Sequence, residues 1–433
     1  MSRGRGARAS ISRSVMHGLV GWGCLLSVAA GVVVTRLHTA EANRAPLPVV
    51  TASLSADQYR QWASFPDYHK IVPVLMYHSI GGKASYLTVS RKLFAEQMRA
   101  LKVAGFHTLT IGQYAHFVKH GYRGLPSRPI LLTFDDGRED AYRAANGLLE
   151  AYGFHVTDLV VPAWVTGHPH FSLSWSQLQQ MAQTSTWSVQ LHFGYGREQI
   201  TYNKDGDTGA AFAYQQYFPA EDGMPGHEET FVQYQKRIAN NMEWGERQLE
   251  QHVPGYKPWS MAIPESDYGQ AGTNDTRIPP FVLGWLDRHF PVVFGGDYLD
   301  KAMGRRFQIA GRYSPRLAYR ISIGPLDTLP VLHCRLLDYL HHVAIWKEYG
   351  CQRLAGLPPS TLAVIHAPIH PRRAVSDGPP PPPQPRPVHR LGAQINPRAI
   401  HGRRVIIGSR PGWRVVIRAT PGTSSAGTTP QHG

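Results

Sequence analysis

The stretch "PILLTFDDGREDAY", residues 129–142, decides the fold, because a strand, an acid pair and the start of a helix follow one another within it. Its first half is an apolar run of the kind that forms a fully buried strand in a parallel sheet. Asp135 and Asp136 come directly after that run, and a glycine follows them. Burying two carboxylates side by side is costly unless a cation lies between them. The pair therefore predicts a metal site, with acids at a helix N-terminus as the simpler alternative.

Adjacent acids at the end of a strand suit hydrolysis. Neighbouring strand residues point to opposite sides, so one carboxylate can hold a metal while the other faces the metal-bound water. The metal lowers the pKa of that water, and the free carboxylate accepts its proton.

Strand and helix patterns alternate on both sides of this stretch, which predicts parallel strands wrapped by helices. Strands are expected at residues 72–80, 106–111, 129–134, 155–161, 187–193, 259–264, 291–296 and 319–323. Helices are expected at residues 90–105, 111–121, 139–153, 174–183 and 228–253, and residues 197–227 look like a long loop. In such folds catalytic groups collect where strands end. Asp135, Asp136 and His192 all fall at such ends.

The net charge of +15 is concentrated at the two ends of the chain. The first 13 residues hold four arginines and no acid, and residues 371–433 hold ten arginines and one acid. The body between them is close to neutral, which argues against a nucleic-acid partner. A polyproline spacer at residues 377–390 and the arginines around it predict a disordered basic tail that meets an anionic wall polymer.

Residues 15–34 form an apolar run with no Lys, Arg, Asp or Glu, which is long enough to span a bilayer. The arginines before it predict a cytoplasmic N-terminus, with the body of the protein outside the cell membrane. Ala40 and Ala42 form a small-x-small site, so a cleaved signal peptide and a secreted protein are the alternative. The predicted organisation is a stub and anchor at 1–35, a linker at 36–70, an α/β body at 71–352 and a tail at 353–433.

Cys334 and Cys351 are the two cysteines of the body. They are expected either to pair in an oxidising compartment or to remain as unpaired core cysteines.

The order of the segments "PVLMYHSI", "LLTFDDGREDAYRAANGLLEAYGFHVT", "LSWSQLQQM" and "WSVQLH" resembles the NodB-type polysaccharide deacetylases, carbohydrate esterase family 4. The resemblance covers roughly residues 70–350 and is closest to the branch that acts on extracellular poly-N-acetylglucosamine. It implies a distorted (β/α)7-type barrel and a divalent metal, usually zinc. It also implies that an N-acetyl group is hydrolysed from an N-acetylated polysaccharide.

The same resemblance assigns roles to single residues. Asp135 would be the general base, and Asp136 and His192 would be metal ligands. His78, in "LMYH", would lie near the mouth of the site, and its alternative is a histidine that merely ends a strand.

The sequence departs from the family where the third metal ligand is expected. The family has a second histidine four or five positions after His192, but Gly196 and Arg197 stand there. Arginine stays protonated and cannot ligate a cation. Arg197 could instead pair with Asp136 in place of a metal. Candidate substitutes for the missing ligand are His168, His170, Glu265 and Asp267.

The oxyanion turn is also altered, because "MAIPESDYG" keeps Pro264 but has Tyr268 and Gly269 two residues late. His333 is the one candidate for the late catalytic histidine of the family. Two functions follow from these departures: a metal-dependent de-N-acetylase outside the cytoplasm, or a non-catalytic glycan-binding protein that has lost the full metal site.

Overall fold

The computed structural model describes residues 46–69, 71–168, 171–195, 199–221, 223–296, 317–340 and 351. All of them belong to the first of the chain's two units, Met1–Gln384. The predicted anchor at 15–34 and the predicted tail at 353–433 lie in parts of the chain that are not described. Among the described residues, no helix combines the length and the apolar character that a membrane span needs.

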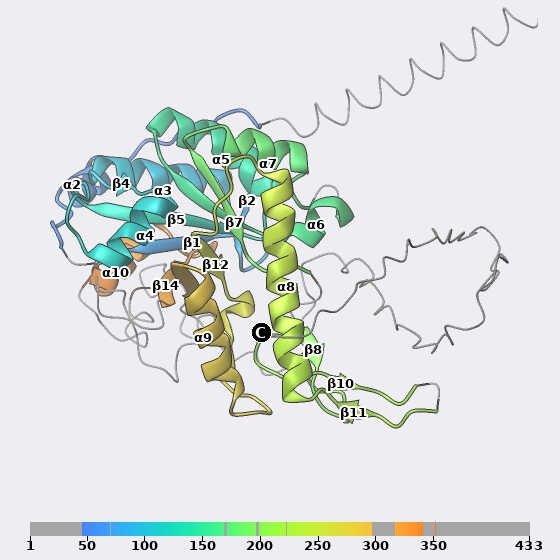
Figure 1. The fold of residues 1–433 in the computed structure, drawn as a ribbon. Coiled ribbons are helices and arrows are strands. Elements are labelled where there is room, and N and C mark those ends of the chain that lie inside the picture. Colours follow the sequence, from blue (N-terminus) through green and yellow to red (C-terminus); the bar gives the residue numbers. More distant parts are fainter. Residues whose placement is uncertain are drawn as a thin grey trace, which may run out of the picture. The chain divides into compact units, whose positions relative to one another are not determined.

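Seven parallel strands close into a barrel, which confirms the predicted (β/α)7 architecture (Figure 1). Around the ring their order is β1, β14, β13, β12, β7, β6 and β5, and the pairing of β1 with β5 closes it. These strands are β1 (Val74–Tyr77), β5 (Pro129–Asp135), β6 (Val156–Val160), β7 (Trp187–Leu191), β12 (Ser260–Ala262), β13 (Val292–Gly296) and β14 (Leu317–Ser322). All are parallel to their neighbours, so every strand ends at the same rim.

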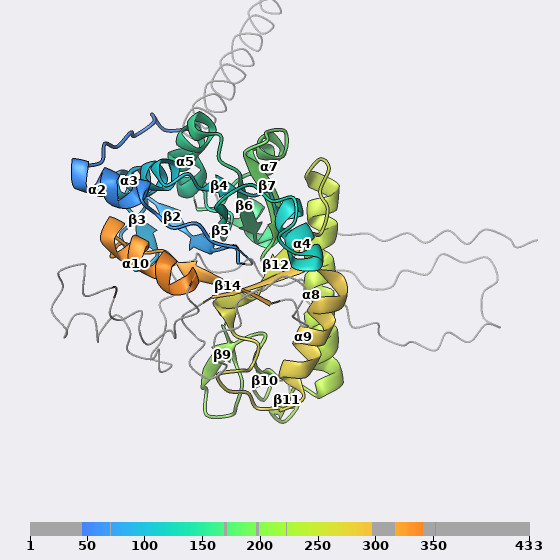
Figure 2. The same ribbon diagram turned by 90° about the vertical axis from the view of Figure 1, so that its left-hand side faces the viewer.

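Helices surround the barrel, as Figure 2 shows. They are α2 (Ala56–Ala63), α3 (Arg91–Val103), α4 (Ile111–His120), α5 (Glu139–Tyr152), α6 (Pro162–Gly167), α7 (Trp175–Ala182), α8 (Phe231–His252), α9 (Ile278–His289) and α10 (Leu329–Leu340). Several begin with capping boxes, in which a Ser or Thr and a Gln three residues later satisfy the first free N–H groups. Ser174 caps α7 in this way with Gln177, as its sequence position predicts.

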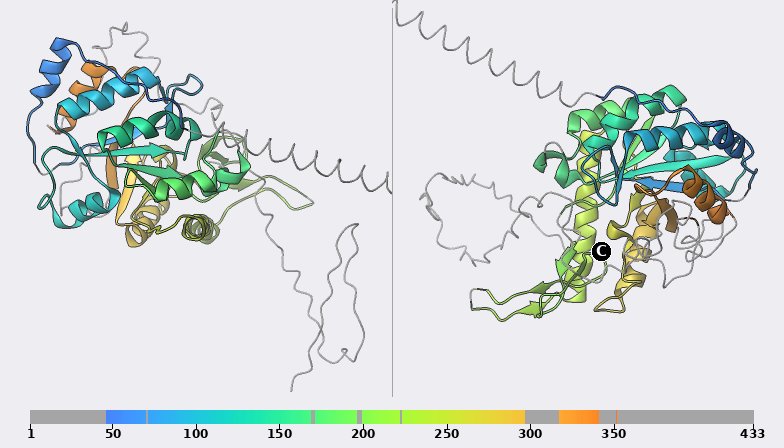
Figure 3. Two further views of the ribbon diagram at one scale, coloured as in Figure 1. Left: turned by 90° about the horizontal axis from the view of Figure 1, so that it is seen from above. Right: turned by 180° about the vertical axis from the view of Figure 1, so that it is seen from behind.

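Several regions differ from the sequence predictions, which did not include the helices α6, α9 and α10. The strand expected at 106–111 shrinks to β4 (His107–Thr108), because Thr110 already caps α4. The loop expected at 197–227 contains two small hairpins, which Figure 3 shows beside the long helix α8. They are formed by β8 (Gln199–Thr201) with β9 (Thr208–Ala210) and by β10 (Tyr217–Phe218) with β11 (His227–Glu228). The linker at 36–70 is expected to be polar with some helix, and its described part does contain a helix, α2, which packs on α3.

Side chains of β5 alternate between two apolar clusters, as strand geometry requires. Leu131 lies in the smaller cluster, which includes residues from the barrel strands and from α4. Leu132 and Phe134 lie in the larger cluster formed with the surrounding helices. By this alternation Asp135 shares the face of Leu131, and it therefore stands at the rim end of the barrel interior.

Candidate active site

Asp135 is held by an arginine that the sequence analysis did not identify. Arg320 of β14 donates from Nη1 to Asp135 Oδ1 at 2.6 Å and from Nη2 to Oδ2 at 2.8 Å. Both side chains are buried, with 1% of Arg320 and 2% of Asp135 exposed. Arg320 also donates to the Gly295 carbonyl and to Thr133 Oγ1, so the guanidinium is fixed on several sides.

The arginine decides the charge of this acid. Burial by itself would raise the pKa of Asp135, but Arg320 and the nearby His192 and His78 more than offset it. The pKa of Asp135 therefore lies below its ordinary value, and the group is a carboxylate at neutral pH. A bidentate pair of this kind also fixes the orientation of the carboxylate.

His192 and Asp136 converge beside it. His192 follows β7, and its Nδ1 donates to the Ala262 carbonyl at 2.9 Å. The Nε2 atom is then left as an acceptor, which is the tautomer a metal ligand needs. It lies 3.8 Å from Asp136 Oδ1 and 3.8 Å from Asp135 Oδ2.

The turn after the strand places Asp136 in this position. Asp136 adopts a left-handed conformation with φ of 75°, which aspartate tolerates better than most residues. Gly137 follows with φ of 59°, and a Cβ there would lie 3.0 Å from the Val160 side chain. A glycine is therefore required at this point, which explains the "DDG" sequence.

His78 completes the group. Its Nε2 lies 4.0 Å from Asp135 Oδ2, on the side of β1. Its Nδ1 is buried and has no hydrogen-bond partner among the described residues. Burial lowers the pKa of His78, although the neighbouring acids oppose this effect. The structure thus brings Asp135, Asp136, His192 and His78 together.

Two donors of a metal site are in place. Two ligand atoms bound to one zinc ion at about 2.1 Å each can be up to about 4.2 Å apart, so 3.8 Å can be bridged by one ion. Asp136 and His192 therefore fit a divalent cation, but a third donor does not accompany them within the described ranges. Among the residues that the structure describes, one set of three His, Cys, Asp or Glu residues has ligand atoms that all lie within 4.8 Å of one another. It consists of Cys334, Asp338 and Cys351. This group is away from the acid pair, and its cysteines form a disulfide.

The residues that the sequence suggested as a third metal ligand either accept hydrogen bonds from other groups or do not form a ligand group with Asp136 and His192. Glu265 accepts from Gln199 with both carboxylate oxygens, at 2.8 and 2.7 Å. Asp267 accepts from the Gly269 N–H at 2.9 Å. His168 is buried, and its Nε2 has no partner in the described part of the chain, but it forms no ligand-sized group with Asp136 and His192. Arg197 and His170 are not among the described residues.

The late catalytic histidine was placed wrongly. His333 lies on α10, where its ring packs against Trp62 of α2 and against Phe65 just after that helix, with ring centroids 5.1 and 5.2 Å away. These aromatic side chains, rather than the barrel rim, form its environment. Its sequence, "LPVLHC", gives no sign of this packing because α2 is far away along the chain.

The oxyanion turn differs in detail from the prediction. Pro264 begins a short 3-10 turn (Pro264–Ser266), and Tyr268 is buried after it. The Tyr268 N–H donates to Gln270 Oε1, and the Gly269 N–H donates within the loop to Asp267. These two amides therefore hold the loop together and are not available to a substrate oxygen.

A second buried acid lies next to the site, and the sequence analysis did not single it out. Asp158 of β6 is level with Phe134 of β5 and Val189 of β7, and 2% of it is exposed. Its Oδ1 has no hydrogen-bond partner within the described chain. Burial, together with the charges of Asp135 and Asp136, raises the pKa of Asp158 well above its ordinary value.

Replacing Asp158 with leucine, which has nearly the same shape, is expected to stabilise the protein by about 1–3 kcal/mol at pH 8, because an unpaired buried polar group is removed. In the unfolded chain Asp158 is ionised once the pH is above its ordinary pKa, whereas in the folded chain its raised pKa keeps it protonated to higher pH. The contribution of Asp158 to the free energy of unfolding is therefore most favourable at a pH below its pKa in the unfolded chain. It becomes less favourable as the pH rises toward its pKa in the folded chain. Thermal unfolding at pH 4 and pH 8 tests this, with Asp158→Asn as the control for charge. A gain that is equal at both pH values would contradict it.

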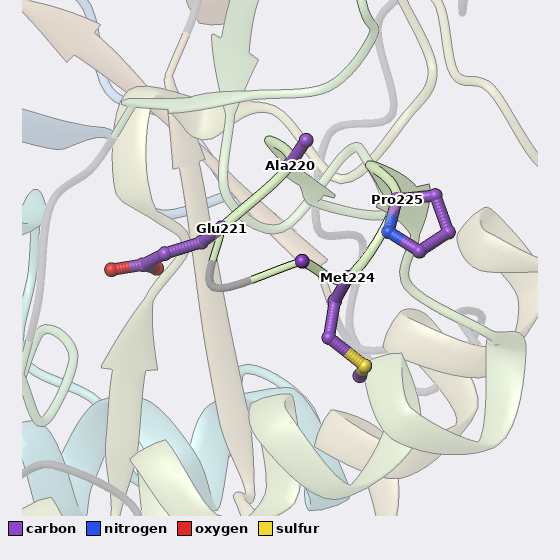
Figure 4. Close-up of a pocket in the computed structure, with 5 residues that line it drawn as sticks. Ala220, Glu221, Met224 and Pro225 are labelled. Atoms are coloured by element: carbon purple, nitrogen blue, oxygen red, sulfur yellow. The ribbon is translucent and has the colours of Figure 1, made fainter.

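A separate pocket of about 390 Å³ lies at the turn between β10 and β11. Figure 4 shows that it is formed by a single hairpin turn. It is lined by Ala220, Glu221, Gly223, Met224 and Pro225. None of the residues of the acid pair or its neighbours contributes to it.

The chain is similar in sequence to known polysaccharide deacetylases. Residues 123–277 match the family described as Polysaccharide deacetylase. YxkH of Bacillus subtilis, named as a candidate polysaccharide deacetylase, is 32% identical over 154 residues, which cover 35% of this chain and 53% of that protein. The poly-β-1,6-N-acetyl-D-glucosamine N-deacetylase of Escherichia coli K12 is 22% identical over 196 residues, covering 41% of this chain and 28% of that protein. The chain thus spans about half or less of these relatives.

Solved structures of similar proteins include two deacetylases. The de-N-acetylase of Aggregatibacter actinomycetemcomitans is 18% identical with a TM-score of 0.47, and covers 58% of this chain and 95% of its own. The BpsB deacetylase domain of Bordetella bronchiseptica is 22% identical with a TM-score of 0.47, and covers 59% and 97%. The sequence matches, the motif order and the closed seven-stranded barrel with the acid pair at its rim make this chain similar to the polysaccharide deacetylases.

Proposed function

We propose that the protein is a de-N-acetylase that removes acetyl groups from an N-acetylated amino-sugar polymer outside the cytoplasmic membrane. The observation that carries this proposal is the convergence of Asp135, Asp136 and His192 at one rim of the barrel. The relatives named as deacetylases support the reaction, and the one from Escherichia coli supports poly-N-acetylglucosamine as the polymer class.

Asp135 is the general base in this proposal. Its pKa is held low by Arg320, so the carboxylate is ready to accept a proton from water at neutral pH. The water oxygen then adds to the amide carbonyl of the N-acetyl group, the C–N bond breaks, acetate leaves and the sugar amine takes a proton. The fixed guanidinium keeps the accepting oxygen in one orientation throughout.

Asp136 and His192 would hold a divalent cation, with zinc as the first candidate. Such an ion, when bound, would lower the pKa of the attacking water and polarise the acetyl carbonyl. The Ala262 carbonyl fixes His192 in the tautomer required for this. The expected position of a third donor, at Gly196 and Arg197, is outside the described residues, so Arg197 remains the main argument for the non-catalytic alternative.

The location is proposed from two features. Cys334 and Cys351 form a disulfide, and disulfides persist chiefly in oxidising compartments. The apolar run at 15–34 predicts a membrane anchor that leaves the barrel on the outer side. The arginine-rich tail would then lie where anionic wall polymers are found.

His78 is proposed as the group that passes a proton to the leaving amine, because it is the second histidine beside Asp135 and, unlike His192, is not assigned to the metal. Replacing His78 with glutamine should lower amide hydrolysis by about 10²–10⁴-fold. An activated aryl acetate has a leaving group that needs no proton, so its hydrolysis should change much less. Rates on both substrates are compared with those of His192→Gln, which should lose both. Equal losses on both substrates in the His78 variant would exclude this role.

Acetate release from N-acetylglucosamine oligomers by the purified full-length chain tests the proposed function. The enzyme hypothesis predicts acetate and a free amine in equal amounts. Binding of the oligomer without acetate release, at any divalent ion supplied, would favour the non-catalytic alternative.

A further inference from the structure

Two histidines form an exposed pair at the end of α4. His116 and His120 are four residues apart, so they are neighbours on one face of the helix. Both are exposed, and their ring centroids lie 4.5 Å apart with an interplanar angle of 39°. His120 lies in the last turn, at the negative end of the helix dipole, which favours a cation, and His116 lies one turn before it.

The ring spacing fits a chelate. If each imidazole binds one ion at about 2.0–2.1 Å, each ring centroid is about 3.2 Å from the ion. Two such rings at right angles around the ion are about 4.5 Å apart, and at a tetrahedral angle about 5.2 Å apart. The observed 4.5 Å therefore matches the right-angled arrangement of square-planar or octahedral ions.

His116 and His120 lie far from Asp135 and Asp136. Residues of α4 pack in the cluster that includes the barrel strands, and β4 before it pairs with the first residues of β5. Asp135 is the last residue of β5, and a strand of seven residues is about 20 Å long. The histidines thus lie near the opposite end of the barrel from the rim.

We propose that His116 and His120 form a second divalent-metal site, independent of the deacetylase site, for a borderline transition ion that prefers right-angled ligands. Cu²⁺ is the strongest candidate, followed by Ni²⁺, because both prefer imidazole nitrogen in square or tetragonal geometry. The two histidines supply two ligands, and water completes the shell on the open surface. Metal counts on the purified protein would then include an ion that takes no part in hydrolysis.

The experiment is a Cu²⁺ titration of the full-length chain at pH 7.5, monitored by calorimetry and by electron paramagnetic resonance. The wild type is expected to bind one more Cu²⁺ than the variant H116A/H120A, with a spectrum showing nitrogen ligands that the variant lacks. Binding at this site should weaken as the pH is lowered, because protons compete with the metal for the imidazole nitrogens.

His107→Ala is the matched control, since His107 is also exposed near this end but its Nδ1 donates to the Ser127 carbonyl. It should keep the extra Cu²⁺. Acetate release should be the same in H116A/H120A and the wild type, which separates this site from the proposed function. Equal Cu²⁺ stoichiometry and affinity in H116A/H120A and the wild type would overturn the proposal.

Discussion

Replacing Asp135 with asparagine is expected to lower acetate release by about 10²–10⁴-fold, because the amide cannot accept the proton of the attacking water. The loss should appear in kcat rather than in substrate binding, since Asp135 acts on water and not on the sugar. The ion held by Asp136 and His192 should remain, so metal content should change little. Steady-state kinetics and metal analysis on the same preparation measure both quantities.

This substitution also leaves Arg320 as a buried charge without its partner. Unfolding must therefore be measured alongside activity. The double variant D135N/R320M removes both charges and should recover much of the lost stability, because breaking a buried pair costs more than replacing it entirely. It should remain inactive. A stable double variant with wild-type acetate release would show that Asp135 is not the base.

Replacing Arg320 with methionine is expected to destabilise the protein by about 3–5 kcal/mol, since it leaves Asp135 buried without its bidentate partner. For a domain of about 280 residues that corresponds to a fall in Tm of roughly 5–9 °C. The carboxylate stabilises the wild type above the unfolded pKa of Asp135, and that contribution is lost as the pH falls through the lower folded pKa. The destabilisation should therefore be largest at neutral pH.

The same variant should change the pH dependence of catalysis. Without the guanidinium, burial raises the pKa of Asp135, so the acid limb of the kcat profile should move to higher pH. Arg335→Met is the matched control, because Arg335 donates to the buried Asp327 at 2.6 Å in a pair that includes none of the proposed catalytic residues. Arg335→Met should lose a comparable free energy of unfolding, while the acid limb of its kcat profile stays at the wild-type pH. An unmoved acid limb in Arg320→Met would contradict the role assigned to this arginine.

The barrel and the acid pair could be predicted from the sequence because their signals are local. An apolar run followed by "DDG" fixes a strand end and a tight turn within a few residues, and Gly137 is required by the close approach of Val160. The position of His192 follows from the same logic, since it comes directly after an apolar strand. These residues meet because all parallel strands end at one rim.

Arg320 could not be predicted, because its pairing with Asp135 joins residues 185 positions apart. The segment "YRISI" predicts a strand but gives no sign that its arginine is buried. Only the closure of the barrel, in which β1 pairs with both β14 and β5, places β14 near β5. Asp158 could have been predicted, because one acid within the apolar run "HVTDLVV" indicates a buried carboxyl group. The position of His333 could not, because its aromatic partners, Trp62 and Phe65, are far away along the chain.

The most direct test of the central claim is acetate release from N-acetylglucosamine oligomers by the full-length chain, measured before and after treatment with a chelator. The account predicts that release stops on chelation, returns on addition of a divalent ion, and is not restored by that ion in His192→Gln. Release that is unaffected by both chelation and His192→Gln, or the absence of any acetate from the wild type with every ion tried, would contradict the claim that Asp135, Asp136 and His192 form a metal-assisted deacetylase site.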